Sequence, residues 1–130
     1  MYKKYNESFG IIIEGFYSSN INDIDKELIK REFEKNGVIL FRGFDFNKDS
    51  LIQYIDSFTL KYVNDAVRRE KRFGSTKIRD VDVGCDEHTL HCEGSYTPPA
   101  CPEIIWFFCN EPPERDGETI LCDGIELWEQ

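Results

Sequence analysis

Hydrophobic positions in the first third of the chain follow a strand pattern and then a helix pattern. Three consecutive isoleucines in residues 10–14 predict a short buried strand. Apolar residues then recur at helical spacing, with Asn22 or Asp23 available as the N-cap. Asn36 and Gly37 end this predicted helix, because glycine readily takes the left-handed conformation that follows a helix C-terminus. The helical positions are Ile21, Ile24, Leu28, Ile29 and Phe33.

A second strand and a second helix follow along the chain. Residues 38–41 are apolar, Val38 and Ile39 are β-branched, and the run is too short for a helix. Asn47, Asp49 or Ser50 could cap the next helix. Residues 64–76 are polar and lack periodicity, which indicates a loop or an irregular segment. The apolar face of the second helix would comprise Leu51, Ile55, Phe58 and Tyr62.

From residue 77 onward the pattern favours β structure. Residues 103–109 form a continuous apolar run, which predicts a strand covered on both faces. Prolines and an Asp-Gly pair in residues 112–117 predict a turn into a further strand at 118–122. A helix is predicted from Asp123 and Gly124 to Trp128. We expect the following side chains to be buried in the core: Cys92, Trp106, Phe107, Phe108, Cys109 and Cys122.

Length and composition narrow the class of protein. With 130 residues, 40 % hydrophobic and 14 % aromatic, the chain is expected to fold as one domain. Its net charge of −9 argues against a nucleic-acid partner, because phosphate binding needs a positive surface. The five cysteines include no C-x-x-C pair, and we see no secretory leader and no apolar run of membrane-spanning length. These features favour free thiols in a cytoplasmic protein away from the membrane.

His91 and Glu93 carry the most specific chemical signal. On an extended segment, side chains two residues apart lie on the same face, so both could reach one metal ion. One imidazole and one carboxylate are two members of the facial triad that holds non-haem Fe(II). The triad needs a second histidine, yet the only other one is His88, and none follows His91. The alternative is a surface strand on which both side chains face water.

A zinc site competes for the same segment. Cys85, His88, His91 and Cys92 are closely spaced, and zinc accepts both sulfur and nitrogen ligands. Structural zinc sites usually combine two such ligand pairs, however, and the next cysteine, Cys101, lies among prolines. The iron site is therefore the preferred hypothesis.

Four stretches together resemble the taurine dioxygenase-like family of Fe(II)- and 2-oxoglutarate-dependent oxygenases. They are residues 37–44, 90–96, 102–109 and 116–124, in that order. The resemblance implies an α+β, mainly β fold: a partial double-stranded β-helix (a cupin-like jelly roll) with two N-terminal helices. It further implies that residues 1–130 are a single domain forming the N-terminal half of that jelly roll, whose C-terminal half is absent from this chain.

The resemblance also implies roles for individual residues. His91 and Glu93 match two metal ligands of the family, with Glu where most members have Asp. Thr119 matches the threonine that binds the far carboxylate of 2-oxoglutarate, and Asp116 stands where a glycine is usual. Glu87 could face substrate, or it could be a solvated loop acid. The family's distal histidine and its oxoglutarate-binding arginine have no match here.

The implied function is that of a dioxygenase subunit using Fe(II) and 2-oxoglutarate to hydroxylate a small molecule such as an amino acid. Another chain would supply the distal histidine and the arginine. That partner would be a complementary chain carrying the second half of the fold, or a second copy of this chain. Alone, the subunit should be inactive or weakly active. The alternative is a non-catalytic binding or structural subunit derived from the same fold.

Overall fold

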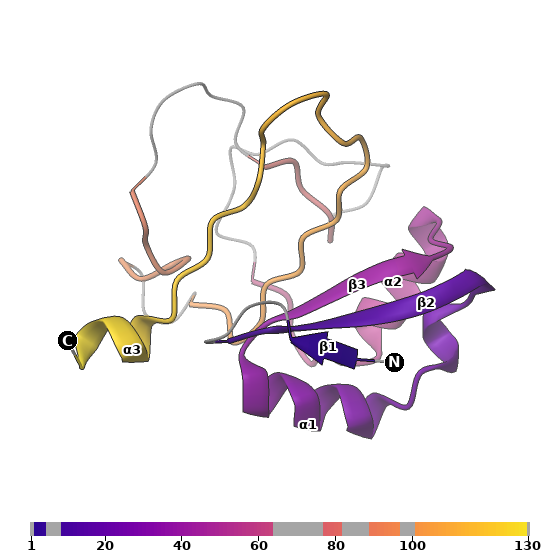
Figure 1. Cartoon of the computed structure of the whole chain (residues 1–130), viewed down its shortest axis with the longest axis horizontal. Helices are drawn as coiled ribbons and strands as arrows, with labels where there is room; N and C mark the ends of the chain where they lie inside the picture. The colour runs from indigo at the N-terminus through magenta and orange to yellow at the C-terminus, as the bar shows by residue number, and fades with distance from the viewer. Residues whose placement is uncertain (1, 5–8, 64–76, 82–88, 97–100, 130) are drawn as a thin grey trace. The chain divides into compact units, whose positions relative to one another are not determined.

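The computed structural model describes residues 2–4, 9–63, 77–81, 89–96 and 101–129. The chain divides into two compact units, Met1–Leu60 and Lys61–Gln130. All the strands assigned in the described ranges, and every helix except the last, belong to the first unit. Figure 1 traces the chain with these elements labelled.

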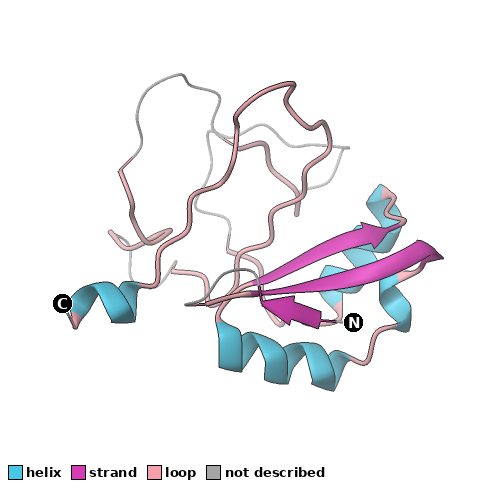
Figure 2. Ribbon diagram, viewed as in Figure 1, coloured by secondary structure: helices cyan, strands magenta, loops and turns pink. Residues whose placement is uncertain are grey.

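The first unit is built on a three-stranded sheet in the order β1-β2-β3 (Figure 2). Strand β1 (Tyr2–Lys4) runs antiparallel to β2 (Ile11–Ser19), and β2 runs parallel to β3 (Ile39–Phe44). A parallel pair requires a crossover connection, and a short 3-10 helix followed by α1 provides it. The strands predicted at 10–14 and 38–41 are thus confirmed, whereas β1 was not predicted from the sequence.

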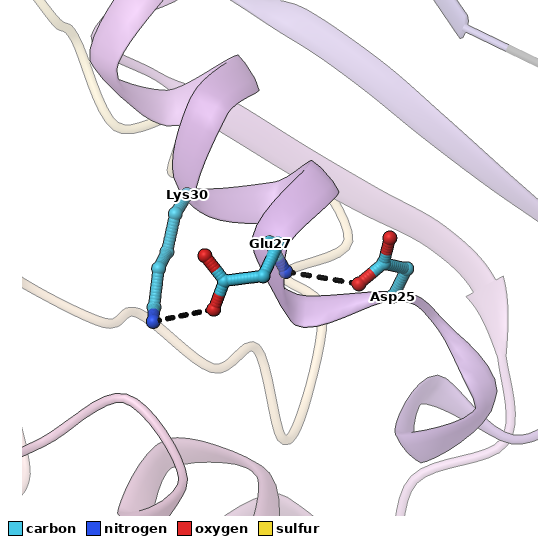
Figure 3. Close-up of polar contacts among 3 residues, drawn as sticks. All are labelled: Asp25, Glu27 and Lys30. Atoms are coloured by element: carbon cyan, nitrogen blue, oxygen red, sulfur yellow. Dashed lines mark hydrogen bonds and ion pairs between the residues drawn. The ribbon is translucent and has the colours of Figure 1, made fainter.

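The crossover begins with the 3-10 helix η1 (Ile21–Asp23), capped by Asn20, and continues with α1 (Lys26–Asn36). The side chain of Asp25 caps α1 by accepting a hydrogen bond from the Glu27 backbone N–H at 3.0 Å. Figure 3 shows this bond and the 2.8 Å ion pair between Glu27 and Lys30. The predicted caps, Asn22 and Asp23, were wrong because η1 already includes both residues.

The C-terminus of α1 agrees with the sequence prediction. Gly37 has a φ of 72°, and its N–H donates to the carbonyl oxygen of Phe33 at 2.8 Å. A positive φ is accessible to glycine at little cost, so the chain can leave the helix here and enter β3.

Helix α2 (Lys48–Asp56) begins at Asn47, one of the three predicted caps. The Asn47 side chain accepts hydrogen bonds from the backbone of Asp49 and Ser50, and the Ser50 hydroxyl oxygen accepts one from the Asn47 N–H. This reciprocal arrangement is a capping box. Leu51 is buried as predicted, but Phe58 and Tyr62 both lie beyond the end of the helix.

The core of the first unit lies between the sheet and the helices. Ile11 and Ile13 of β2 and Ile29 of α1 are buried. On β3, Ile39 pairs in register with Ile11, and Phe41 pairs with Ile13. Side chains alternate along a strand, so Ile11 and Ile13 share the face that packs on the helices. The partly buried side chains around this cluster are Ile24, Ile39, Phe41, Phe44 and Phe58.

The second unit differs most from the sequence prediction. Neither 103–109 nor 118–122 forms a strand, because a strand requires a hydrogen-bonded neighbour and no ladder joins these runs to another described segment. The predicted terminal helix is confirmed as α3 (Gly124–Trp128), capped by Asp123. The part of the chain described therefore shows a mixed α/β arrangement with three strands, and a jelly roll is not seen in it.

Side chains expected in a core are instead exposed in this unit. Cys92, Cys109 and Cys122 are exposed, as is Cys101, and all four thiols are free. Phe107 is 61 % exposed and Phe108 is also exposed, while Trp106 is intermediate. The prediction that these side chains are buried was wrong for the chain by itself, since an apolar run is covered only where other segments pack against it. No helix in the described ranges is long and apolar enough to cross a membrane.

Candidate metal centre

His91 is exposed, and its imidazole is held by a local backbone contact. The ring Nδ1 lies 2.8 Å from the carbonyl oxygen of Thr89. A carbonyl oxygen only accepts hydrogen bonds, so this contact requires the proton on Nδ1. In the neutral ring, Nε2 then carries a lone pair that can bind a metal ion. Histidines that bind metals usually donate their second ring N–H to a carbonyl or carboxylate in this way.

Glu93 lies in a tight turn rather than on a strand. The Ser95 N–H donates to the Cys92 carbonyl oxygen at 3.3 Å, and Gly94 has a φ of 67°. A four-residue turn with a positive φ at its third position has the features of type II and favours glycine there. The argument that an extended strand aligns His91 with Glu93 was therefore wrong. Instead, a short loop and turn carry both, with Glu93 half-buried.

A complete metal site is not formed by the described residues. They include no group of three or more His, Cys, Asp or Glu side chains that could hold a metal ion. His91 and Glu93 are thus two candidate ligands without a third in the described part of the chain. Three other candidates, Glu87 and the possible zinc ligands Cys85 and His88, lie outside the described residues.

Thr119, the candidate 2-oxoglutarate ligand, is exposed and follows a turn. The turn contains two consecutive residues with positive φ, Asp116 at 57° and Gly117 at 84°. Aspartate is one of the few non-glycine residues that tolerate this conformation. Asp116 can therefore take the place of the usual glycine and still allow the chain to turn into residues 118–122.

Comparison with known families decides the ancestry of the chain. The family model described as taurine catabolism dioxygenase TauD, TfdA family matches residues 3–130. The chain belongs to this family. No curated protein and no solved structure matches it significantly. Membership implies descent from Fe(II)- and 2-oxoglutarate-dependent dioxygenases, so the resemblance inferred from the sequence motifs is confirmed.

Two features around His91 and Glu93 were not predicted from the sequence. The first is the Thr89 carbonyl that orients His91, which no sequence pattern could reveal, because every residue has a carbonyl group. The second is the turn at Glu93. Its signal was present in the sequence, since Gly94 directly after Glu93 is the residue type that the third position of a type II turn favours.

Proposed function

We propose that this chain supplies two of the protein ligands, His91 and Glu93, to the Fe(II) site of a 2-oxoglutarate-dependent dioxygenase. Another chain would supply the distal histidine and the arginine that binds 2-oxoglutarate. The observation that carries the proposal is the 2.8 Å contact between His91 Nδ1 and the Thr89 carbonyl, which leaves Nε2 as the donor for a metal.

The donor chemistry fits a ferrous ion. Neutral imidazole and anionic carboxylate are the ligand types of the two-histidine, one-carboxylate site. When bound, Fe(II) would supply the reactivity with O₂ and a 2-oxo acid that amino-acid side chains lack. Thr89 would fix the tautomer and orientation of His91, and Glu93 would balance part of the metal's charge.

Thr119 would act on the second substrate. Its hydroxyl can donate one hydrogen bond, which suits the far carboxylate of 2-oxoglutarate. The proposed reaction is hydroxylation of a small molecule such as an amino acid, which is the substrate class that the family resemblance suggests. Without the distal histidine and the arginine, we expect the isolated chain to bind Fe(II) weakly and to turn over slowly or not at all.

The metal-site assignment is tested by anaerobic Fe(II) titration of the full chain in a calorimeter. His91→Ala and Glu93→Ala should each weaken binding by roughly tenfold or more. His88→Ala is the matched control, since it removes the other histidine of the sequence and should leave Fe(II) affinity unchanged. Unchanged binding in both His91→Ala and Glu93→Ala would exclude the assignment.

The same variants separate iron from zinc. If the segment were a zinc site, Zn²⁺ binding would be lost in His88→Ala and Cys92→Ser. If it is the proposed iron site, both variants should retain Fe(II) binding, because neither side chain is among the proposed ligands.

Activity is tested by measuring succinate release from 2-oxoglutarate, with this chain alone and with a candidate partner chain. A productive partner should restore turnover, and Thr119→Val should then raise the KM for 2-oxoglutarate more than it lowers kcat. The matched control is Thr59→Val on the first unit. The Thr59 hydroxyl donates to the Ile55 carbonyl oxygen at 2.8 Å.

One observation favours a second candidate, a non-catalytic binding or structural subunit. Within the described ranges, no three side chains form a group that could hold a metal ion. A chain with this role should bind its partner equally well with and without Fe(II), and adding that partner should produce no succinate.

A further inference from the structure

The strongest unexplained feature is the apolar surface of residues 103–128, here named the C-terminal apolar segment. Ile105, Phe107 and Trp128 are 45 %, 61 % and 91 % exposed, although side chains of this size are usually buried. Exposed apolar groups gathered in one stretch of chain indicate an interaction surface rather than chance exposure. The full set of large exposed residues is Ile104, Ile105, Phe107, Phe108, Ile120, Leu121, Ile125, Leu127 and Trp128.

Exposure of the apolar run at 103–109 is not limited to one side of the chain. Adjacent residues Ile104 and Ile105 are both exposed, and so are Phe107 and Phe108. Neighbouring side chains in a non-helical segment do not share one direction, so a flat surface cannot cover all of them. A partner would have to surround the run, as the layers of a β fold surround an inner strand.

Charge decides which kind of partner fits. Between residues 101 and 129 there are eight acidic residues and one basic residue, Arg115. A second copy that bound through the same segment would place two strongly acidic segments against each other, and like charges across an interface oppose association. A partner that carries Lys and Arg around an apolar surface would be attracted instead. The eight acidic residues are Glu103, Glu111, Glu114, Asp116, Glu118, Asp123, Glu126 and Glu129.

We propose that the C-terminal apolar segment docks onto a different protein chain, one with an apolar surface bordered by Lys and Arg. This inference deepens the proposed function, because it names the surface of this chain that binds the second chain and the charge that the second chain carries. It rests on the proposed function only in identifying the partner as the chain that supplies the remaining iron-site residues. Its test contains neither iron nor 2-oxoglutarate, so each proposal can fail by itself.

The test uses two synthetic amphipathic peptides that share the same apolar residues and differ only in carrying Lys or Glu at the polar positions. The two tryptophans of the chain, Trp106 and Trp128, both lie in the C-terminal apolar segment, so their fluorescence reports binding there. We expect the Lys peptide to bind roughly tenfold tighter or more at low salt and to shift Trp emission to shorter wavelength. That preference should shrink as salt screens the charges.

Matched variants distinguish docking at this segment from general attraction to an acidic protein. Phe107→Ser should weaken binding of the Lys peptide, whereas Phe16→Ser, at an 80 % exposed side chain on β2, should not. Glu103→Gln combined with Glu118→Gln should reduce the difference between the two peptides. Glu34→Gln on α1 is the control for that pair, and circular dichroism checks that each variant folds.

Three outcomes would overturn the proposal. The first is equal affinity for the two peptides, and the second is no binding of either one. The third is a dimer of the full chain at low salt, detected by sedimentation velocity and abolished by Phe107→Ser, which would make a second copy the occupant. A chain that stays monomeric at low salt and prefers the Lys peptide supports the proposal.

Discussion

At the scale of single residues, Tyr54 shows how burial controls ionisation. Its side chain on α2 is completely buried, with ring centroids 5.9 Å from Phe41 and 5.0 Å from Phe58, both edge-on. Desolvation by burial raises the pKa of Tyr54 from 10.0 to about 12, because the phenolate would lose its hydration in this environment. The predicted apolar face of the second helix omitted this residue, although it is the most completely buried residue in that helix.

This pKa shift predicts a loss of stability at alkaline pH. Below pH 10, folded and unfolded Tyr54 both keep the proton, so the contribution is fully present. Between pH 10 and about 12 the unfolded state ionises first, and the free energy of unfolding should fall by about 2 to 3 kcal/mol. Urea unfolding across this range measures the loss. Tyr54→Phe keeps the ring and should lack this part of the pH dependence; an identical alkaline loss in both proteins would contradict the assignment.

The backbone of Asp116 makes a second prediction for a single residue. Its φ of 57° is strained for most side chains, and most of all for a β-branched one. Asp116→Val should therefore destabilise the second unit by about 1 to 2 kcal/mol, whereas Asp116→Gly should be nearly neutral. Urea unfolding followed by the fluorescence of Trp106 and Trp128 measures both. Glu114→Val is the control for adding a valine nearby, and a similar loss in that variant would show that φ is not the cause.

At the scale of elements, the contact between β2 and β3 depends on two glycines. A Cβ on Gly43 would lie 2.7 Å from the Gly15 carbonyl oxygen, and one on Gly15 would lie 2.9 Å from the Gly43 carbonyl oxygen. The regular register of the two strands is interrupted in this region, between Glu14 and Ser19. The strands can approach this closely only because neither residue has a side chain.

Gly43→Ala should consequently be more disruptive than the same change at Gly37. Both glycines have nearly the same positive φ, 73° and 72°, but nothing lies within 4 Å of a Cβ placed on Gly37. Gly37→Ala should cost about 1 kcal/mol, and Gly43→Ala about 2 to 4 kcal/mol, since it adds a clash with backbone. Circular dichroism during urea unfolding compares them. Equal losses would show that the close approach of the strands contributes nothing.

At the scale of the whole molecule, the two units differ in how much regular structure they contain. Ile12 and Ile13 lie on the central strand, which is paired on both sides. Residues 103–109 belong to no helix or strand, and their large side chains are exposed except for Trp106, which is intermediate. Backbone amides exchange slowly where a stable ladder must open and quickly where none exists.

Hydrogen exchange should therefore separate the units clearly. Amides of Ile12 and Ile13 should exchange on the order of a hundredfold more slowly than those of residues 103–109 in the isolated chain. Adding a partner that docks on the C-terminal apolar segment should slow exchange at 103–109 and leave β2 unchanged. Strong protection of 103–109 in the isolated chain would contradict the exposure seen there.

Local sequence determined most of the first unit and the ancestry of the chain. Apolar periodicity predicted β2, α1, β3 and α2, and cap residues predicted the ends at Asn47 and Gly37, because both signals act over a few neighbouring residues. The ordered motifs, including His91 and Glu93, predicted the TauD family that the family model confirms. Roles for His91, Glu93 and Thr119 remain predictions.

Tertiary structure decided what depends on partners distant in the sequence. The run 103–109 has the composition of an inner strand, but a strand and a buried core exist only where other segments supply hydrogen bonds and contacts. Here most of its side chains are exposed. The pairing of β1 likewise depends on contacts with residues of β2. The caps of η1 and α1 and the turn at Glu93, by contrast, are contacts between near neighbours in the sequence. Apolar composition sets what a segment can bury, and the surrounding structure determines whether it is buried.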